Sequence, residues 1–350
     1  MRAIILIILG IALFMPFSAV AGTAGIFAEC ASIDDDKARL KCYDDASGRA
    51  SKTTETGTSE GKSPPAALSP AIPKTAAKPQ DPPDPTGLSV LARQWDLDET
   101  NRARKFVIKP YRGNYVLPVA YNTSPNDDAY LDLDTNAKPQ HTEAKFQISF
   151  KVKLWEDILG RDVDLWFGYT QLAFWQVYNR TFSSPFRETD YEPELLLNFR
   201  TDYDVFGLKG RFINLGLNHQ SNGRSEPLSR SWNRVVANFG FERGPYNMLL
   251  KTWYRIPESE SDDDNPDIEK YMGYGELGGY YFWKKTRFGM MVRNNLRRDN
   301  KGAIQLDVAV PLIERISAYF QYFNGYGESL ADYNKSVNRF SIGFMITDWY

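Results

Sequence analysis

An unbroken alternation of apolar and polar residues runs through Phe146-Gln147-Ile148-Ser149-Phe150-Lys151-Val152-Lys153-Leu154. Successive side chains of a β-strand point to opposite faces, so this segment would present one apolar face and one polar face. A run of about ten such residues is the length of a tilted strand that crosses a membrane, whereas strands of soluble β-sandwiches are usually shorter. The segment therefore predicts an amphipathic strand of membrane-spanning length.

Two further segments carry the same alternation. In the first, alternate positions are apolar: Ile304, Leu306, Val308 and Val310. We expect this strand to end at Pro311, because proline cannot donate to the ladder of a sheet. In the second, at the C-terminus, alternate residues share one face: Phe340, Ile342, Phe344, Ile346, Asp348 and Tyr350. A final amphipathic strand that closes on an aromatic residue resembles the assembly signal of bacterial outer-membrane barrels, although Asp348 departs from its apolar pattern.

The composition agrees with a β-protein and excludes two other classes. The 350 residues include 8 Trp, 20 Tyr and 21 Phe, and aromatic residues are enriched in strands. Lysine and arginine number 42 against 44 aspartates and glutamates, a net charge of −2, so nothing favours binding to nucleic acid. Beyond the N-terminal segment no apolar run reaches the roughly 18 residues of a membrane-spanning helix, which excludes a helical membrane protein but not a barrel.

The N-terminus predicts export. Arg2 precedes an apolar run, and Ala19-Val20-Ala21 has the small-x-small pattern of a cleavage site. We therefore expect residues 1–21 to be a signal peptide that is cut after Ala21.

The two cysteines of the chain, Cys30 and Cys42, both lie in residues 22–46, a small segment that has little apolar material for a core. In an exported chain we expect a disulfide between them. A metal or redox pair is the alternative, which the lack of a CxxC spacing and of a nearby histidine disfavours.

Two regions complete the chain. Residues 47–90 are rich in Pro, Ser, Thr and Lys and are expected to form a linker, because they cannot bury enough apolar area to order themselves. Residues 91–350 would form a single domain. Export, strands of about ten residues, and many Tyr and Trp near strand ends together predict an all-β, antiparallel transmembrane barrel in the outer membrane of a Gram-negative cell. A large soluble β-sandwich or a periplasmic barrel is the alternative.

The chain has two histidines, which makes the search for a general base short. His141 lies in a polar, turn-like context and is expected to be solvated. His219 and Ser221 share the apolar, outward face of the strand around residues 213–223, and Asn233 lies on the apolar side of the following strand. In a hairpin the three would meet at one rim of the barrel, facing lipid.

A serine activated by a histidine whose tautomer is fixed by a third side chain is the general arrangement for acyl transfer, and asparagine can take the third place. A site on the outer face would receive its substrate from the bilayer. The alternative is an ordinary polar strand end at the membrane interface.

The residues around this triad extend the pattern. The segment His219-Gln220-Ser221-Asn222-Gly223-Arg224-Ser225-Glu226-Pro227-Leu228-Ser229-Arg230-Ser231-Trp232-Asn233-Arg234 resembles the active-site segment of the outer membrane phospholipase A family. Further matches follow in order along the chain: Ser183-Ser184-Pro185-Phe186-Arg187-Glu188-Thr189, Tyr191-Glu192-Pro193, Asn265-Pro266-Asp267-Ile268, Tyr271-Met272-Gly273-Tyr274 and Gly325-Tyr326-Gly327-Glu328-Ser329-Leu330. The resemblance covers most of the barrel domain and leaves the N-terminal segment and the linker outside.

The resemblance implies a twelve-stranded barrel that hydrolyses acyl esters of phospholipids and lysophospholipids, with A1 and A2 activity, requires Ca²⁺ and is active as a homodimer. Ser221 would be the nucleophile, His219 the base and Asn233 the residue that orients the histidine.

The resemblance also implies a calcium site next to the serine. Its ligands would be the Arg224 carbonyl, the Ser229 hydroxyl and Asp264, together with Ser183 of the partner subunit, and oxygen ligands suit this hard cation. The family has an acidic residue where this chain has Glu226, whose longer side chain leaves a second calcium position open.

Gln171 is the residue that points to self-association. It shares parity with Leu165, Phe167 and Tyr169, so it would face lipid, where an amide needs a hydrogen-bonding partner such as a second copy of itself. The family has a dimer-interface glutamine at this position. The alternative is that Gln171 lies at the headgroup level and is hydrated.

Two functions from other classes remain open on the sequence. A polar lumen would suffice for a passive channel, which makes no use of Ser221. An outer-membrane protease would need carboxylates at the rim, and Asp262-Asp263-Asp264 supplies acidic residues, although such a run is more often a solvated loop or a cation site.

Overall fold

The computed structural model describes residues 30, 33, 35, 37–39, 41–42, 89–98, 102–126, 139–160, 162–182 and 185–347. The chain divides into two units, residues 1–75 and 76–350. In the first unit Cys30 and Cys42 form a disulfide, with their Cα atoms 5.5 Å apart. The expected signal peptide and nearly all of the expected linker lie outside the described residues, so the limits of the domains stay predictions.

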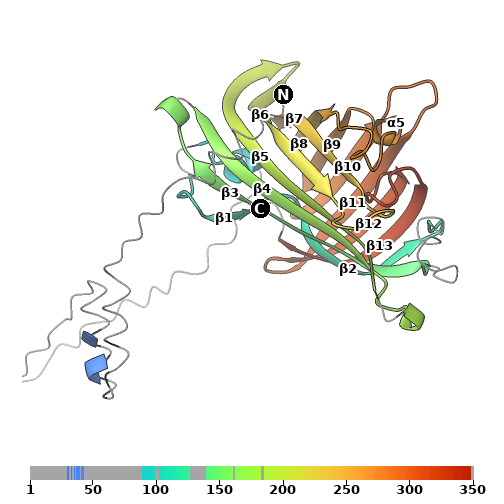
Figure 1. The fold of residues 1–350 in the computed structure, drawn as a ribbon. Coiled ribbons are helices and arrows are strands. Elements are labelled where there is room, and N and C mark those ends of the chain that lie inside the picture. Colours follow the sequence, from blue (N-terminus) through green and yellow to red (C-terminus); the bar gives the residue numbers. More distant parts are fainter. Residues whose placement is uncertain are drawn as a thin grey trace, which may run out of the picture. The chain divides into compact units, whose positions relative to one another are not determined.

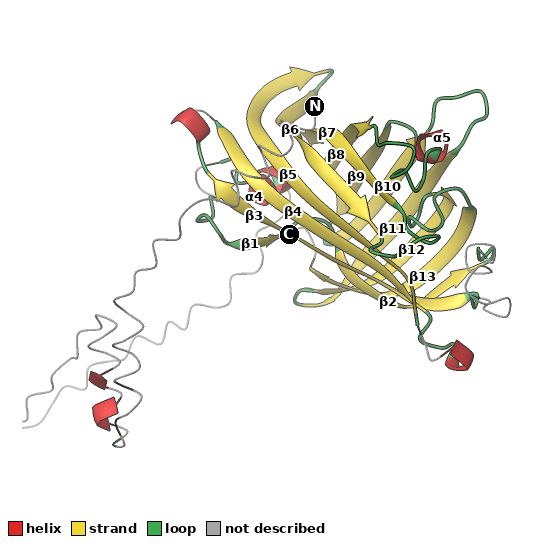
Figure 2. Cartoon of the chain, viewed as in Figure 1, coloured by secondary structure: helices red, strands yellow, loops and turns green. Residues whose placement is uncertain are grey.

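The second unit is a closed antiparallel barrel (Figures 1 and 2). Its strands are β1 (Ile108–Pro110), β2 (Asn114–Asn122), β3 (Thr142–Trp155), β4 (Val163–Trp175), β5 (Phe186–Val205), β6 (Leu208–Ser221), β7 (Ser231–Arg243), β8 (Tyr246–Ile256), β9 (Gly275–Trp283), β10 (Thr286–Asn294), β11 (Gly302–Ile313), β12 (Ile316–Tyr326) and β13 (Ser336–Thr347). Each strand from β2 to β13 pairs with its neighbours in sequence, and β13 pairs with β2 to close the ring. The short β1 pairs with β3 beyond the end of β2, so the ring has twelve strands.

Burial in the barrel is the reverse of that in a soluble protein. In β6 the side chains of Leu215 and Leu217 are 45% and 52% exposed, whereas Asn214 and Asn218 are 0% and 3% exposed. The apolar side chains therefore face outward and the polar ones face the lumen, which is the arrangement of a barrel whose outer surface contacts lipid. This confirms the predicted fold class.

The alternation that begins at Phe146 lies within β3 and behaves as predicted. Ile148 is exposed on the outer face, whereas Lys151 and Lys153 are buried in the lumen. Helix α4 (Val90–Trp95) and its C-cap residue Asp96 contact these buried cations: Lys151 Nζ lies 3.2 Å from the centre of the Trp95 ring, and Lys153 pairs with Asp96 at 3.0 Å. The lumen near this helix is therefore packed with side chains.

The two other predicted strands are present, with different ends. Strand β11 continues through Pro311 to Ile313, with a shift of register between these two residues. The prediction that it ends at Pro311 is wrong, because the irregular pairing at the strand end tolerates a residue without an N–H donor. In β13, Phe340 and Phe344 are exposed on the outer face as predicted, while Asp348 and Tyr350 lie outside the described residues.

The connections at the two ends of the barrel differ in length. Two-residue turns at 206–207, 244–245, 284–285 and 314–315 lie at one end, and the longer loops 176–185, 222–230, 257–274, 295–301 and 327–335 lie at the other. Outer-membrane barrels have short periplasmic turns and longer extracellular loops, so the long loops mark the cell-surface end. Among the described residues, no helix is long and apolar enough to cross a membrane.

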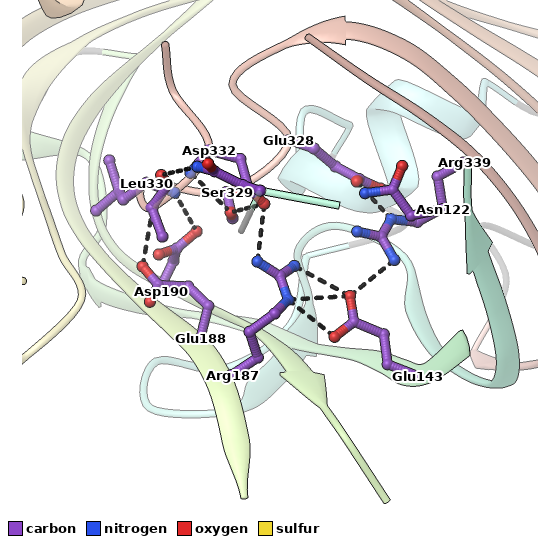
Figure 3. Close-up of polar contacts among 12 residues, drawn as sticks. Asn122, Glu143, Arg187, Glu188, Asp190, Glu328, Ser329, Leu330, Asp332 and Arg339 are labelled. Carbon is purple, nitrogen blue, oxygen red and sulfur yellow. Dashed lines mark hydrogen bonds and ion pairs between the residues drawn. The ribbon is translucent and has the colours of Figure 1, made fainter. Parts of the chain in front are cut away.

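The loop 327–335 folds back into the barrel at this end and contacts β5 (Figure 3). The Leu330 N–H donates to Asp190 at 3.0 Å, and Arg187 pairs with Asp332 at 2.9 Å. Arg187 also pairs with Glu143 of β3 at 2.9 Å. These buried ion pairs and hydrogen bonds cross-link the mouth of the lumen.

Candidate active site

Strands β6 and β7 bring two of the predicted catalytic residues into contact. His219 is the cross-strand partner of Asn233, and its Nδ1 atom lies 2.9 Å from the Asn233 Oδ1 atom. A carboxamide oxygen can only accept, so Nδ1 carries the proton and Nε2 is left as the basic atom of the neutral ring. The contact therefore selects the tautomer that a general base requires.

Ser221 is the last residue of β6, two positions beyond His219 on the same face. Residues two apart on a strand are separated by about 7 Å along the chain. Within the part of the chain that the structure describes, no hydrogen bond joins the Ser221 hydroxyl to the His219 ring. Such bonds are often long without substrate, so this spacing remains compatible with a nucleophile and its base.

The loop that follows Ser221 is closed by the side chain of the next residue, Asn222. Asn222 is buried, its Nδ2 donates to the Leu228 carbonyl at 2.8 Å, and its Oδ1 accepts from the backbone N–H groups of Arg224 and Arg230 at 3.3 and 3.0 Å. One side chain thus fixes both ends of residues 223–229. The signal in the sequence was an asparagine beside a glycine, which is typical of a turn but does not reveal these partners.

Two of the predicted calcium ligands lie together. The Ser229 hydroxyl donates to Asp264 Oδ2 at 2.5 Å, which joins the β6–β7 loop to the β8–β9 loop. Arg255 of β8 fixes the β8–β9 loop, because its guanidinium donates to Asp263 at 2.6 Å and to the Asn265 carbonyl at 3.2 Å. In the described part of the chain, no cluster of three or more His, Cys, Asp or Glu side chains could hold a metal ion. A cation here would therefore rely on hydroxyl and carbonyl oxygens as well.

Three further predicted positions around the calcium site are Arg224, Ser183 and Glu226. Arg224 lies in the same loop as Ser229, and its guanidinium donates to the Arg187 carbonyl at 2.6 Å. Ser183 lies outside the described residues, so its part in the site stays a prediction. Glu226 is exposed at the tip of the loop, and a second calcium position around it stays open.

Gln171 lies on β4, where Leu165, Phe167 and Tyr169 precede it on the same face. It is partly exposed, and the Tyr169 hydroxyl donates to its Oε1 atom at 3.2 Å. An amide on the outer face of the barrel can meet a second copy there, and dimerisation through Gln171 stays a prediction.

The sequence profile of phospholipase A1 matches residues 91–346. The chain belongs to the phospholipase A1 family. Phospholipase A1 of Klebsiella pneumoniae is 41% identical over 245 residues, which cover 70% of this chain and 84% of the relative. This family match confirms the resemblance on which the site residues were chosen.

Solved structures of family members share the fold. Outer membrane phospholipase A from Escherichia coli is 38% identical, with a TM-score of 0.66 over 70% of this chain and 100% of that one. A calcium-bound dimer of the Salmonella typhi outer membrane phospholipase is 37% identical, with a TM-score of 0.66 over 73% of this chain and 96% of that one. The twelve-stranded barrel and the match to outer membrane phospholipase A show that this protein is located in the outer membrane.

Family membership favours an esterase over the channel and the protease. The acidic run also has structural partners, since Asp263 binds Arg255 and Asp264 accepts from Ser229. No carboxylate pair is thus left over from this run to act on a peptide bond.

Proposed function

We propose that this family member is a calcium-dependent phospholipase that uses Ser221, His219 and Asn233 to hydrolyse acyl esters. The observation that carries the proposal is the 2.9 Å contact between His219 Nδ1 and Asn233 Oδ1. It lies at the cell-surface end of β6, on the lipid-facing side, with Ser221 two residues further on. A base with a fixed tautomer beside a hydroxyl on this face has no role in a channel.

Each residue then has one chemical task. His219 Nε2 accepts the hydroxyl proton as Ser221 Oγ attacks the ester carbonyl, and Asn233 accepts from Nδ1 of the imidazolium that forms. The proton passes to the departing glycerol oxygen, and the acyl group stays on Ser221. A water that gives its proton to His219 then releases the fatty acid and regenerates the serine.

The oxygens near Ser221 fit a bound calcium ion. Ser229 Oγ and Asp264 Oδ2 lie 2.5 Å apart, and hydroxyl, carboxylate and carbonyl oxygens are the donors that Ca²⁺ prefers. Ser229, Asp264 and the Arg224 carbonyl would hold it, with Ser183 of the partner subunit. When bound, calcium supplies Lewis-acid stabilisation of the negative charge that develops on the carbonyl oxygen. The calcium-bound dimer of the Salmonella typhi relative supports this assignment.

The substrates and the assembly follow from the position of the site. A nucleophile on the outer face at the membrane boundary meets phospholipids and lysophospholipids that enter the outer leaflet. We propose a homodimer through Gln171, because a partly exposed amide on the lipid-facing side gains a hydrogen-bonding partner in a second copy. Association would then complete the calcium site, and activity would be controlled by dimerisation.

The experiment is hydrolysis of phosphatidylethanolamine and its lyso form in detergent micelles by the refolded chain. Ser221→Ala should abolish release of fatty acid, as should chelation of calcium in the wild type. Ser225→Ala is the matched control, because Ser225 is exposed in the same loop. Full activity of Ser221→Ala, or of the chelated wild type, would overturn the proposal.

A further inference from the structure

Glu258 is a carboxylate behind the proposed triad. It lies two residues after the end of β8, and its Oε1 atom accepts from Asn233 Nδ2 at 2.6 Å. The pairing of Asn233 with Ile256 across β7 and β8 brings the start of this loop next to the asparagine. The Glu258 side chain is only 17% exposed. His219, Asn233 and Glu258 thus form a continuous chain of hydrogen bonds.

This contact decides how the carboxamide is oriented. Asparagine has an acceptor at one end and a donor at the other, and either end could face the imidazole. A carboxylate can only accept, so Glu258 requires Nδ2 on its own side and leaves Oδ1 for His219. The reversed amide would point a donor at Nδ1, favour the tautomer protonated at Nε2 and remove the base.

Glu258 also brings negative charge to a triad whose third member is neutral. A carboxylate that accepts from the Asn233 amide polarises it and strengthens the acceptor at Oδ1, because hydrogen bonds in a chain reinforce one another away from water. The imidazolium that forms during attack would be stabilised through this relay.

No described side chain competes closely with Asn233 for the Glu258 carboxylate. The nearest cation, Arg255, lies 3.9 Å from Glu258 Oε2 and makes a shorter contact of 2.6 Å with Asp263. Glu258 Oε2 is buried and makes no hydrogen bond to any described residue. The Asn233 amide is therefore the hydrogen-bond donor to this carboxylate.

We propose that Glu258 is a positioning residue of the Ser221 site, which acts through Asn233 on His219. The proposal rests on the proposed function and adds a fourth member to the triad. It also explains how a neutral asparagine can serve where an aspartate is commoner.

The first test compares Glu258→Gln with Glu260→Gln, an exposed position in the same loop. A glutamine can still accept from Asn233 Nδ2 but lacks the negative charge that strengthens this bond, and the loss of that charge should lower kcat about 10-fold. KM and the thermal unfolding of the detergent-folded barrel should stay unchanged, and Glu260→Gln should behave as wild type. Wild-type kcat in Glu258→Gln would overturn the proposal, as would a loss of activity that matches a loss of folded protein.

The second test separates positioning from a structural role. In Asn233→Asp the new carboxylate lies beside Glu258, and two like charges in contact should hold His219 poorly. The double variant Asn233→Asp with Glu258→Gln should be more active than Asn233→Asp alone. If Glu258 were only structural, its replacement would lower activity further, and the proposal would be wrong.

The two proposals fail in different ways. If Ser221→Ala keeps activity, the proposed function is wrong whatever Glu258 does. If Ser221→Ala is inactive while Glu258→Gln matches wild type, only the positioning role is lost.

Discussion

Arg187 Nη1 lies 2.9 Å from Asp332 Oδ2 and joins β5 to the β12–β13 loop across 145 residues of sequence. Arg187 also contacts Glu143, which is bound in turn by Arg339 at 2.7 Å (Figure 3). The group is buried inside the barrel, at the end where the proposed site lies. The lumen therefore serves as a polar core that supports the loops, and the chemistry is left to the outer face.

Replacement of Arg187 should destabilise the barrel strongly. Arg187→Met would leave Glu143 and Asp332 with one buried charge partner fewer, and breaking a buried ion pair costs about 3–5 kcal/mol. The free energy of unfolding in detergent, from guanidinium titrations, measures this cost. Arg315→Met is the control, because Arg315 is exposed in a two-residue turn and should change stability by less than about 0.5 kcal/mol. Equal stabilities of the two variants would contradict a polar core.

Glu328 should make the stability of the barrel sensitive to acid. Burial would raise the pKa of its carboxyl, but Arg339 and Lys145, at 2.6 and 2.8 Å, hold that pKa below the ordinary value. A carboxyl with a lowered pKa stabilises the fold above its unfolded pKa of about 4.3, and this stabilisation is lost as the pH falls through the folded pKa. The free energy of unfolding should therefore fall below about pH 4.3, less steeply in Glu328→Gln. Identical slopes for both proteins would show that Glu328 does not contribute.

Gln171 should control the amount of dimer. Gln171→Leu would remove the proposed hydrogen bond between the two subunits, which in a membrane is worth about 0.6–2 kcal/mol, so dimerisation should weaken about threefold to thirtyfold. Sedimentation in detergent with calcium measures the dimer fraction, and activity should fall in parallel at low protein density. Leu165→Val, further back on the same strand face, is the control. If Gln171→Leu dimerises as wild type does, control by association through this residue is wrong.

Asp264 should set the calcium requirement. Asp264→Asn removes the carboxylate that contacts Ser229, and the calcium concentration for half-maximal activity should rise at least about tenfold. Asp262→Asn is the matched control, because Asp262 accepts from Ser259 in the exposed part of the same loop. An unchanged calcium dependence in Asp264→Asn would place the ion elsewhere.

The sequence predicted the faces of the strands better than their ends. The alternation around Phe146 and in β6 fixes which side chains face lipid, because a period of two has only one register that keeps apolar residues outside. The end of β11 was misplaced, since a shift of pairing at Pro311 depends on the neighbouring strand. Helix α4 was not foreseen, because six residues are too few to show a helical period.

Without the family resemblance, the proposed site could be anticipated only where residues share a hairpin. His219, Ser221 and Asn233 were singled out because alternation places all three on the outer face of two consecutive strands, whereas Ser229 and Asp264 were named only from the family resemblance. Glu258 comes from a loop after β8, where no periodicity links its position to Asn233. The hydrogen bonds of Asn222 to both ends of its loop depend on how the loop closes, and no local sequence pattern reveals them.

The most direct measurement is covalent labelling of the refolded, calcium-loaded barrel with a long-chain alkylsulfonyl fluoride, followed by peptide mapping by mass spectrometry. We predict a single sulfonyl adduct on Ser221, no adduct in His219→Ala, and slower labelling in Asn233→Ala. An adduct on another serine, or equal labelling of Ser221 without His219, would contradict a nucleophile activated by this histidine.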